Sequence, residues 1–76
     1  MYESKVIDAE NDSWYYFAPP GSSYELISAM NGDWDAKGVR VTGVAKQPKT
    51  NVGIVFFETP VTGKMRINLL WINSRY

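Results

Sequence analysis

Apolar and polar side chains alternate along much of this 76-residue chain, in short runs that end at turn-forming residues. Alternation at period two places successive side chains on opposite faces of a strand. Five apolar runs can be recognised, at residues 13–18, 24–30, 39–45, 52–57 and 64–72. Their spacing leaves no room for helical crossovers, so the pattern predicts an all-β or β-rich fold of short antiparallel strands.

The last run shows the alternation most clearly. One face would carry Met65, Ile67, Leu69 and Trp71, and the other would carry Lys64, Arg66 and Asn68. The proline-containing segments 47–51 and 59–63 are typical of turns, so the last three runs are expected to form a meander. Gly43 interrupts the alternation of the run at 39–45, which indicates a bulge or a bend. A further edge strand is expected at residues 2–7.

The run at 24–30 has two interpretations. Ser22 and Glu25 fit a capping box, and Asn31 with Gly32 fits a helix stop, so one short helix at about 23–31 is compatible with the sequence. The same residues would equally form a strand that leads into the turn at 31–33. The sequence leaves the choice between helix and strand open.

From about residue 14 to residue 72 the chain resembles small bacterial OB-fold domains. The resemblance lies in Tyr24-Glu25-Leu26, Gly38-Val39-Arg40-Val41-Thr42-Gly43, Val52-Gly53-Ile54 and Arg66-Ile67-Asn68. The strand spacing predicts that residues 1–76 form a single small domain, a barrel of five to six antiparallel strands or a sandwich. The resemblance implies a binding scaffold whose ligands meet the face of the central strands and the loops beside it. An SH3-like barrel is the alternative architecture.

The net charge of zero conceals a strong asymmetry along the chain. Residues 1–36 carry seven acidic side chains and one basic one (1 − 7 = −6), whereas residues 37–76 carry seven basic side chains and one acidic one (7 − 1 = +6). Such asymmetry is typical of contact with nucleic acid or another charged partner, and equally of two halves that fold against each other. A chain this short also builds only a small core, so association with another chain would add to its stability.

Several kinds of chemistry are excluded by composition. The sequence contains no histidine and no cysteine, which removes imidazole relays, thiolate nucleophiles, disulfides and most transition-metal sites. Asp33 and Asp35 are spaced as a carboxylate pair or the start of a calcium loop, but Ala36 and Thr42 stand where that loop requires Gly and Glu. We therefore expect no enzyme and no cofactor.

The sequence says less about where the protein is located than about its chemistry. No stretch approaches the roughly 20 apolar residues of a membrane span, and the polar start of the chain does not fit a signal peptide. We expect no membrane partner and a cytoplasmic location by default. Export after removal of a signal is left open.

The aromatic run at 14–17 suggests a binding surface, because it places two rings on each face of one strand, more than a core requires. The alternative is that Trp14 and Tyr16 belong to the core. The predicted binding residues are Trp14, Tyr15, Phe17, Trp34, Arg40, Lys46, Lys49, Lys64 and Arg66. The first hypothesis is docking on a protein partner or a second copy of the chain, because aromatic residues and arginine are enriched at interface hot spots. The second is single-stranded nucleic-acid binding of the OB type, and the third is a carbohydrate- or calcium-linked module.

Overall fold

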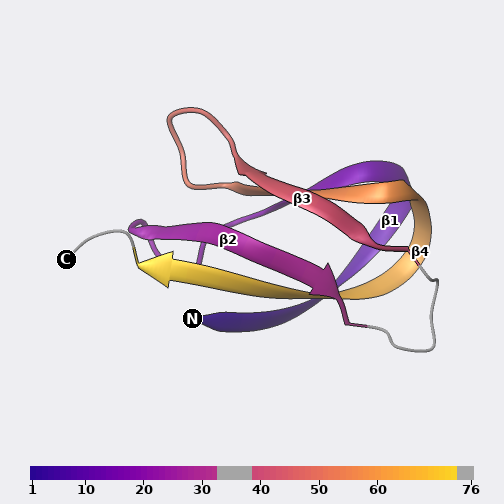
Figure 1. Ribbon diagram of the computed structural model, residues 1–76, viewed down its shortest axis with the longest axis horizontal. Coiled ribbons are helices and arrows are strands. Elements are labelled where there is room, and N and C mark those ends of the chain that lie inside the picture. The colour runs from indigo at the N-terminus through magenta and orange to yellow at the C-terminus, as the bar shows by residue number, and fades with distance from the viewer. Residues whose placement is uncertain (33–38, 74–76) are drawn as a thin grey trace.

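The computed structural model describes residues 1–32 and 39–73, which form four strands and no helix (Figure 1). The strands are β1 (Tyr2–Phe17), β2 (Tyr24–Asn31), β3 (Val41–Lys46) and β4 (Gly53–Asn73). The expectation of an all-β fold is therefore confirmed. Residues 1–32 and 39–73 include no helix that is long and apolar enough to span a membrane.

The ambiguous run at 24–30 is strand β2, so the helix interpretation is wrong. The strand pairs antiparallel with β4, with Leu26 opposite Trp71 and Ala29 opposite Leu69, and a bulge lies between Leu26 and Ser28. Leu26 is buried by this pairing, and Ala29 packs against the core. The ladder satisfies the backbone groups that a helix would have satisfied internally, so tertiary pairing overrides the weak capping signals.

All three other strands pair with β4 in antiparallel ladders. Its C-terminal half lies between the start of β1 and strand β2, with Ile7 opposite Met65 on one side. Its N-terminal half lies between the end of β1 and strand β3, with Trp14 opposite Phe56 and Val44 opposite Val55. The sheet therefore has two three-stranded halves that share β1 and β4.

The two halves meet where β1 and β4 bend together. The β1–β4 register shifts on both sides of Asp12, and residues 58–60 have no partner in β1. Pro60 lies in this unpaired stretch, where its missing N–H removes no ladder bond. Asn11 and Gly63 have positive φ angles of 60° and 93°, which mark the local twist. The expected turn at 59–63 is a bend within one strand, so the predicted meander reduces to the β3–β4 hairpin.

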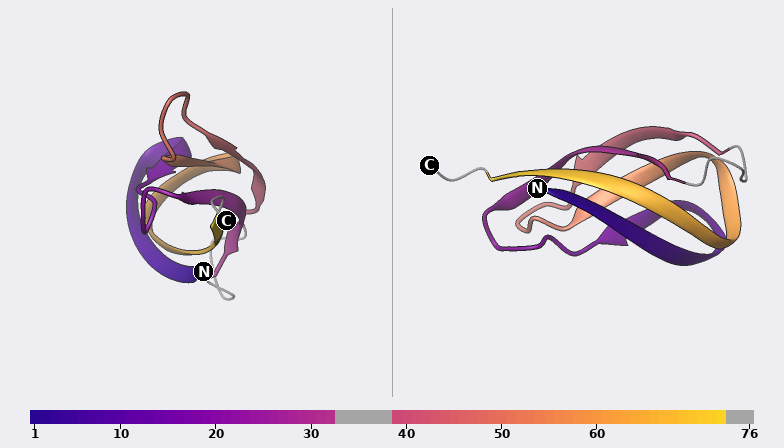
Figure 2. Two further views of the ribbon diagram at one scale, coloured as in Figure 1. Left: turned by 90° about the vertical axis from the view of Figure 1, so that its left-hand side faces the viewer. Right: turned by 90° about the horizontal axis from the view of Figure 1, so that it is seen from below.

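The strands curve around one another in the end-on view of Figure 2, and the buried hydrophobic side chains form one core cluster. Its buried hydrophobic residues are Ile7, Ala9, Phe17, Leu26, Val55, Phe57, Val61, Met65, Ile67, Leu69 and Trp71. The predicted inward face of the last run is thereby confirmed. The Trp71 indole Nε1 donates a hydrogen bond to Glu3 Oε1 over 2.9 Å, so the largest buried side chain also has a polar partner.

Strands β2 and β3 lie side by side, yet no ladder joins them, and the sheet is not closed. Polar contacts link β2 to β3 and to the segment before it: Lys46 Nζ lies 3.4 Å from Glu25 Oε1, and Asn31 Nδ2 donates to the Val39 carbonyl over 2.9 Å. The architecture is thus a small antiparallel sheet of four strands. A closed barrel of five to six strands is not what the described residues form.

Candidate binding face

The outer side of the half-sheet formed by β1, β4 and β3 carries three exposed rings. Trp14, Tyr16 and Phe56 have 52%, 53% and 37% of their surface exposed. Trp14 lies opposite Phe56, which lies opposite Gly43, and Tyr16 lies opposite Ile54, which lies opposite Ala45. Residues directly opposite in an antiparallel pair share a face. We call the set Trp14, Tyr16, Gly43, Ala45, Ile54 and Phe56 the aromatic face.

The neighbouring rings of the same run point inward. Phe17 is 5% exposed, and Tyr15 packs partly buried against the core. Their ring centroids are 5.4 Å apart at an interplanar angle of 48°. Tyr15 lies opposite the fully buried Val55, so the ladder with β4 determines which rings face out. The alternative that Trp14 and Tyr16 belong to the core is therefore wrong, and so is the expectation of Phe17 at a docking surface.

Gly43 leaves an opening in the aromatic face. A Cβ atom built at Gly43 would meet no atom within 4 Å, and the β3–β4 register shifts just before this residue. The predicted bulge at Gly43 is thus confirmed. The Phe56 ring consequently has open space on its β3 side. On the β1 side, a hollow of about 390 Å³ is lined by Asp12, Trp14, Tyr15 and Tyr16.

Charges around the aromatic face are largely compensated. Arg40 Nη2 lies 3.2 Å from Glu58 Oε2, and both side chains are well exposed. Lys46 pairs with Glu25 on β2, as described above. Lys49 lies in the β3–β4 loop, beside a hollow of about 470 Å³ that Lys46, Thr50 and Asn51 also line. Exposed pairs of this kind contribute about 0–1 kcal/mol to stability, so their main effect here is to reduce the local positive potential.

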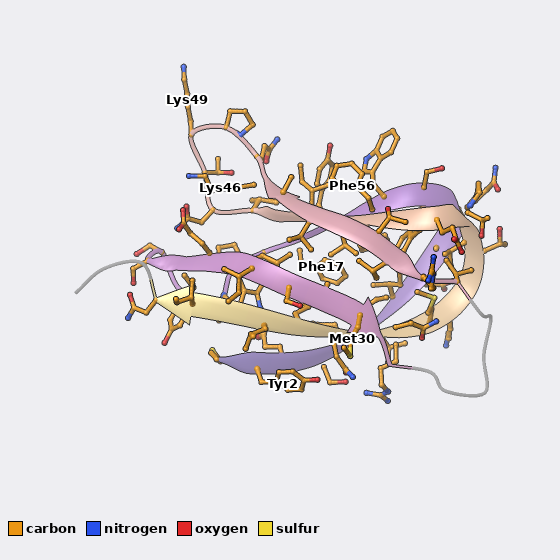
Figure 3. All side chains as sticks on the ribbon, in the orientation of Figure 1. Tyr2, Phe17, Met30, Lys46, Lys49 and Phe56 are labelled. Atoms are coloured by element: carbon orange, nitrogen blue, oxygen red, sulfur yellow. The ribbon has the colours of Figure 1, made fainter. Side chains whose placement is uncertain are left out.

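The predicted binding residues do not form one surface. Arg40, Lys46 and Lys49 belong to β3 and its flanking segments, whereas Lys64 and Arg66 lie on the outer side of the other half-sheet. In Figure 3, Phe56, Lys46 and Lys49 lie on one side of the molecule, Tyr2 and Met30 on the other, and Phe17 between them. Trp34, Asp33 and Asp35 lie outside the described residues.

Only Trp14 of the aromatic face was in the predicted set, and its two other rings, Tyr16 and Phe56, were missing from it. For Phe56 the sequence signal was present, since residues 52–57 are apolar on both faces and one of those faces must point away from a small core. Within residues 1–32 and 39–73, no group of three or more acidic side chains lies together in a way that would hold a metal ion. Comparison with models of protein families, curated proteins and solved structures gives no match to this chain.

Proposed function

We propose that this chain is a non-catalytic binding module that docks a protein partner through its aromatic face. The observation that carries the proposal is the arrangement of Trp14, Tyr16 and Phe56, three exposed rings on adjacent strands of one small sheet. Isolated exposed hydrophobic residues are ordinary, but a contiguous apolar patch on a small domain marks an interaction site.

The chemistry of the face suits a protein surface. Tryptophan and tyrosine are the residues most enriched at interface hot spots, where truncation of one such anchor costs about 2 kcal/mol or more of binding free energy. Trp14 and Tyr16 stand on a paired strand, so little backbone conformational freedom is lost on binding. The open space at Gly43 would receive one side chain of the partner beside Phe56.

Single-stranded nucleic acid is the second candidate, favoured by Lys46 and Lys49, which line one hollow where β3 ends. Exposed rings with adjacent cations are the usual platform for stacked bases. Against it, Arg40 and Lys46 are each paired with a carboxylate. Nucleic-acid affinity depends on uncompensated cations, so a protein partner fits these charges better.

Site-specific photo-crosslinking in the host cell tests the proposal. A benzophenone amino acid replaces Tyr16 on the aromatic face, and the matched control carries it at Tyr2, an exposed tyrosine on the opposite side. We expect position 16 to give one discrete product with another protein, which position 2 does not give. A Trp14→Ala change should reduce that product at least fivefold. Absence of the product, or its persistence with Trp14→Ala, would overturn the proposal.

The nucleic-acid candidate has its own measurement. Labelled single-stranded RNA and DNA are titrated with the protein at 50 and 200 mM salt. Binding that weakens steeply with salt, and weakens again with Lys49→Ala, would replace the protein partner by nucleic acid. Affinity that is absent or insensitive to salt would remove the second candidate.

A further inference from the structure

A second apolar surface lies on the outer side of the other half-sheet, formed by the start of β1, the C-terminal half of β4, and β2. Its large hydrophobic side chains are 39–63% exposed: Tyr2, Val6, Ile27, Met30, Leu70 and Ile72. The registers place Tyr2, Leu70 and Ser28 in one row across the sheet, and Ser4, Asn68 and Met30 in the next. We call this surface the second face. The rings of the aromatic face take no part in it.

We propose that the second face is a self-association surface, on which a second copy of this chain packs face to face with its strands antiparallel to those of the first. The two-fold axis would cross the strands at the row of Ser4, Asn68 and Met30. Each sheet would then cover the same rows of the other, as an isologous contact requires.

The size of the surface fits a dimer. Six large side chains with 39–63% exposure amount to roughly 600 Å² of exposed area, at the upper limit of the largest patch on a typical monomer. A standard interface buries about 800 Å² on each partner, which this patch and its polar rim would approach. Two regular sheet faces also pack readily, at a separation of about 10 Å.

The charges of the second face select the orientation. Lys64 lies opposite Asp8, and Arg66 opposite Val6, at one end of the face, while Tyr2, Leu70 and Ile72 occupy the other end. A parallel arrangement would place Lys64 on Lys64 and Arg66 on Arg66 of the second copy, with like charges facing each other.

In the antiparallel arrangement the basic end of each copy covers the apolar end of the other. Arg66 would lie above Leu70 of the second copy and beside its Tyr2 ring, in position for a cation–π contact. Lys64 would lie above Ile72 of the second copy, near its Glu25, because Glu25 lies opposite Ile72. In this orientation Lys64 therefore approaches Glu25 of the second copy and not the Lys64 of that copy.

The free edge of β1 is unsuited to strand addition, which favours association through faces. Lys5 lies opposite the fully buried Ile67, so it stands on the core-facing side of an edge strand. Glu3 occupies the same side, opposite Leu69. Charges turned inward on an edge strand, together with the irregularities around Asp12, are recognised devices against edge-to-edge pairing. A face-to-face pair of copies uses both second faces, so no further copy can add to it, and it leaves both aromatic faces exposed.

Sedimentation equilibrium at 1–500 μM tests the self-association. Leu70→Arg is compared with the matched control Phe56→Arg, since both residues lie on β4 with 39% and 37% exposure. We expect wild type and Phe56→Arg to dimerise equally. Leu70→Arg should weaken dimerisation at least tenfold, because it places a second guanidinium group against Arg66 of the other copy. Circular dichroism and thermal melts establish that both variants fold. A wild type that is monomeric throughout, or equal effects of the two variants, would overturn the proposal.

The absence of cysteine allows a test of orientation. Single cysteines replace Met30, which lies in the row of the two-fold axis, or Lys64, which lies far from it. A bismaleimide that spans about 10 Å, the separation of packed sheets, should join two copies of Met30→Cys and leave Lys64→Cys uncrosslinked. Efficient joining through Lys64→Cys would contradict the antiparallel arrangement. Neither experiment involves the partner of the aromatic face, so each proposal can fail without the other.

Discussion

The aromatic face and the second face are built on the two halves of one strand, β4, yet their chemistry differs. The N-terminal half displays Ile54 and Phe56 between the rings of β1 and the open position of Gly43. The C-terminal half displays Lys64 and Arg66 at one end and Leu70 and Ile72 at the other. The aromatic face, with rigid rings and compensated charges, suits the surface of a different protein. The second face, with a basic end and an apolar end, can cover a rotated copy of itself. The bend at 58–60 separates the two faces while both rest on one core.

The largest expected effect tests whether the two faces share one cooperative core. Phe57→Ala removes a buried ring beneath the aromatic face, and Trp71→Ala removes one beneath the second face. Each change should lower the free energy of unfolding by about 3–5 kcal/mol. Urea denaturation followed by fluorescence and by circular dichroism should give coincident transitions for both variants. If one variant melted only its own half-sheet, the two faces would be independent units.

A pair of glycines should sharpen the contrast between the packed core side of the sheet and the open aromatic face. A Cβ at Gly53 would lie 2.7 Å from Leu26 Cδ2 and 2.9 Å from Leu26 Cβ, whereas Gly43 has no neighbour within 4 Å. Gly53→Ala should therefore cost about 1–3 kcal/mol through overpacking, and Gly43→Ala less than about 0.5 kcal/mol. Urea midpoints measure both. Equal losses would mean that the Gly43 position is not open.

A substitution in the β3–β4 loop should change the stability of the protein without changing binding at the aromatic face. Lys49 has a φ angle of 67°, a left-handed conformation that asparagine adopts more readily than lysine. Lys49→Asn should raise the free energy of unfolding by up to about 1 kcal/mol while it removes a cation from the β3–β4 loop. Gln47→Asn, at a position without positive φ, is the control for thermal melts. Crosslinking from position 16 should persist in Lys49→Asn, because the proposed docking depends on the rings.

The smallest effect concerns the ion pair beside the aromatic face. A double-mutant cycle of Arg40→Ala and Glu58→Ala should give a coupling free energy between 0 and about 1 kcal/mol, because both side chains are well exposed. The coupling should shrink in 1 M salt, where charges are screened within about 3 Å. A coupling above about 2 kcal/mol, beyond the range of exposed pairs, would indicate that the pair holds β3 against β4.

Those parts of the fold that alternate strictly were predictable from the sequence. The run at 64–72 has a polar residue at every second place up to Asn68, so its buried face could be read directly and is the one observed. Residues 14–17 and 52–57 have no such marker, because apolar side chains occupy both faces. For these runs the sequence indicated surplus rings but not which rings were surplus.

The amino-acid sequence alone determined an extended, mostly antiparallel chain with a small core, more aromatic surface than that core holds, and no histidine or cysteine chemistry. Tertiary structure decided that residues 53–73 form one bent strand, that Trp14 and Tyr16 face outward while Phe17 faces inward, and that the cations divide between two faces. The reason is that side-chain periodicity is a local property of the backbone. When a strand is apolar on both sides, the face that points to the core depends on its register with residues about 40 positions away, which no local pattern encodes.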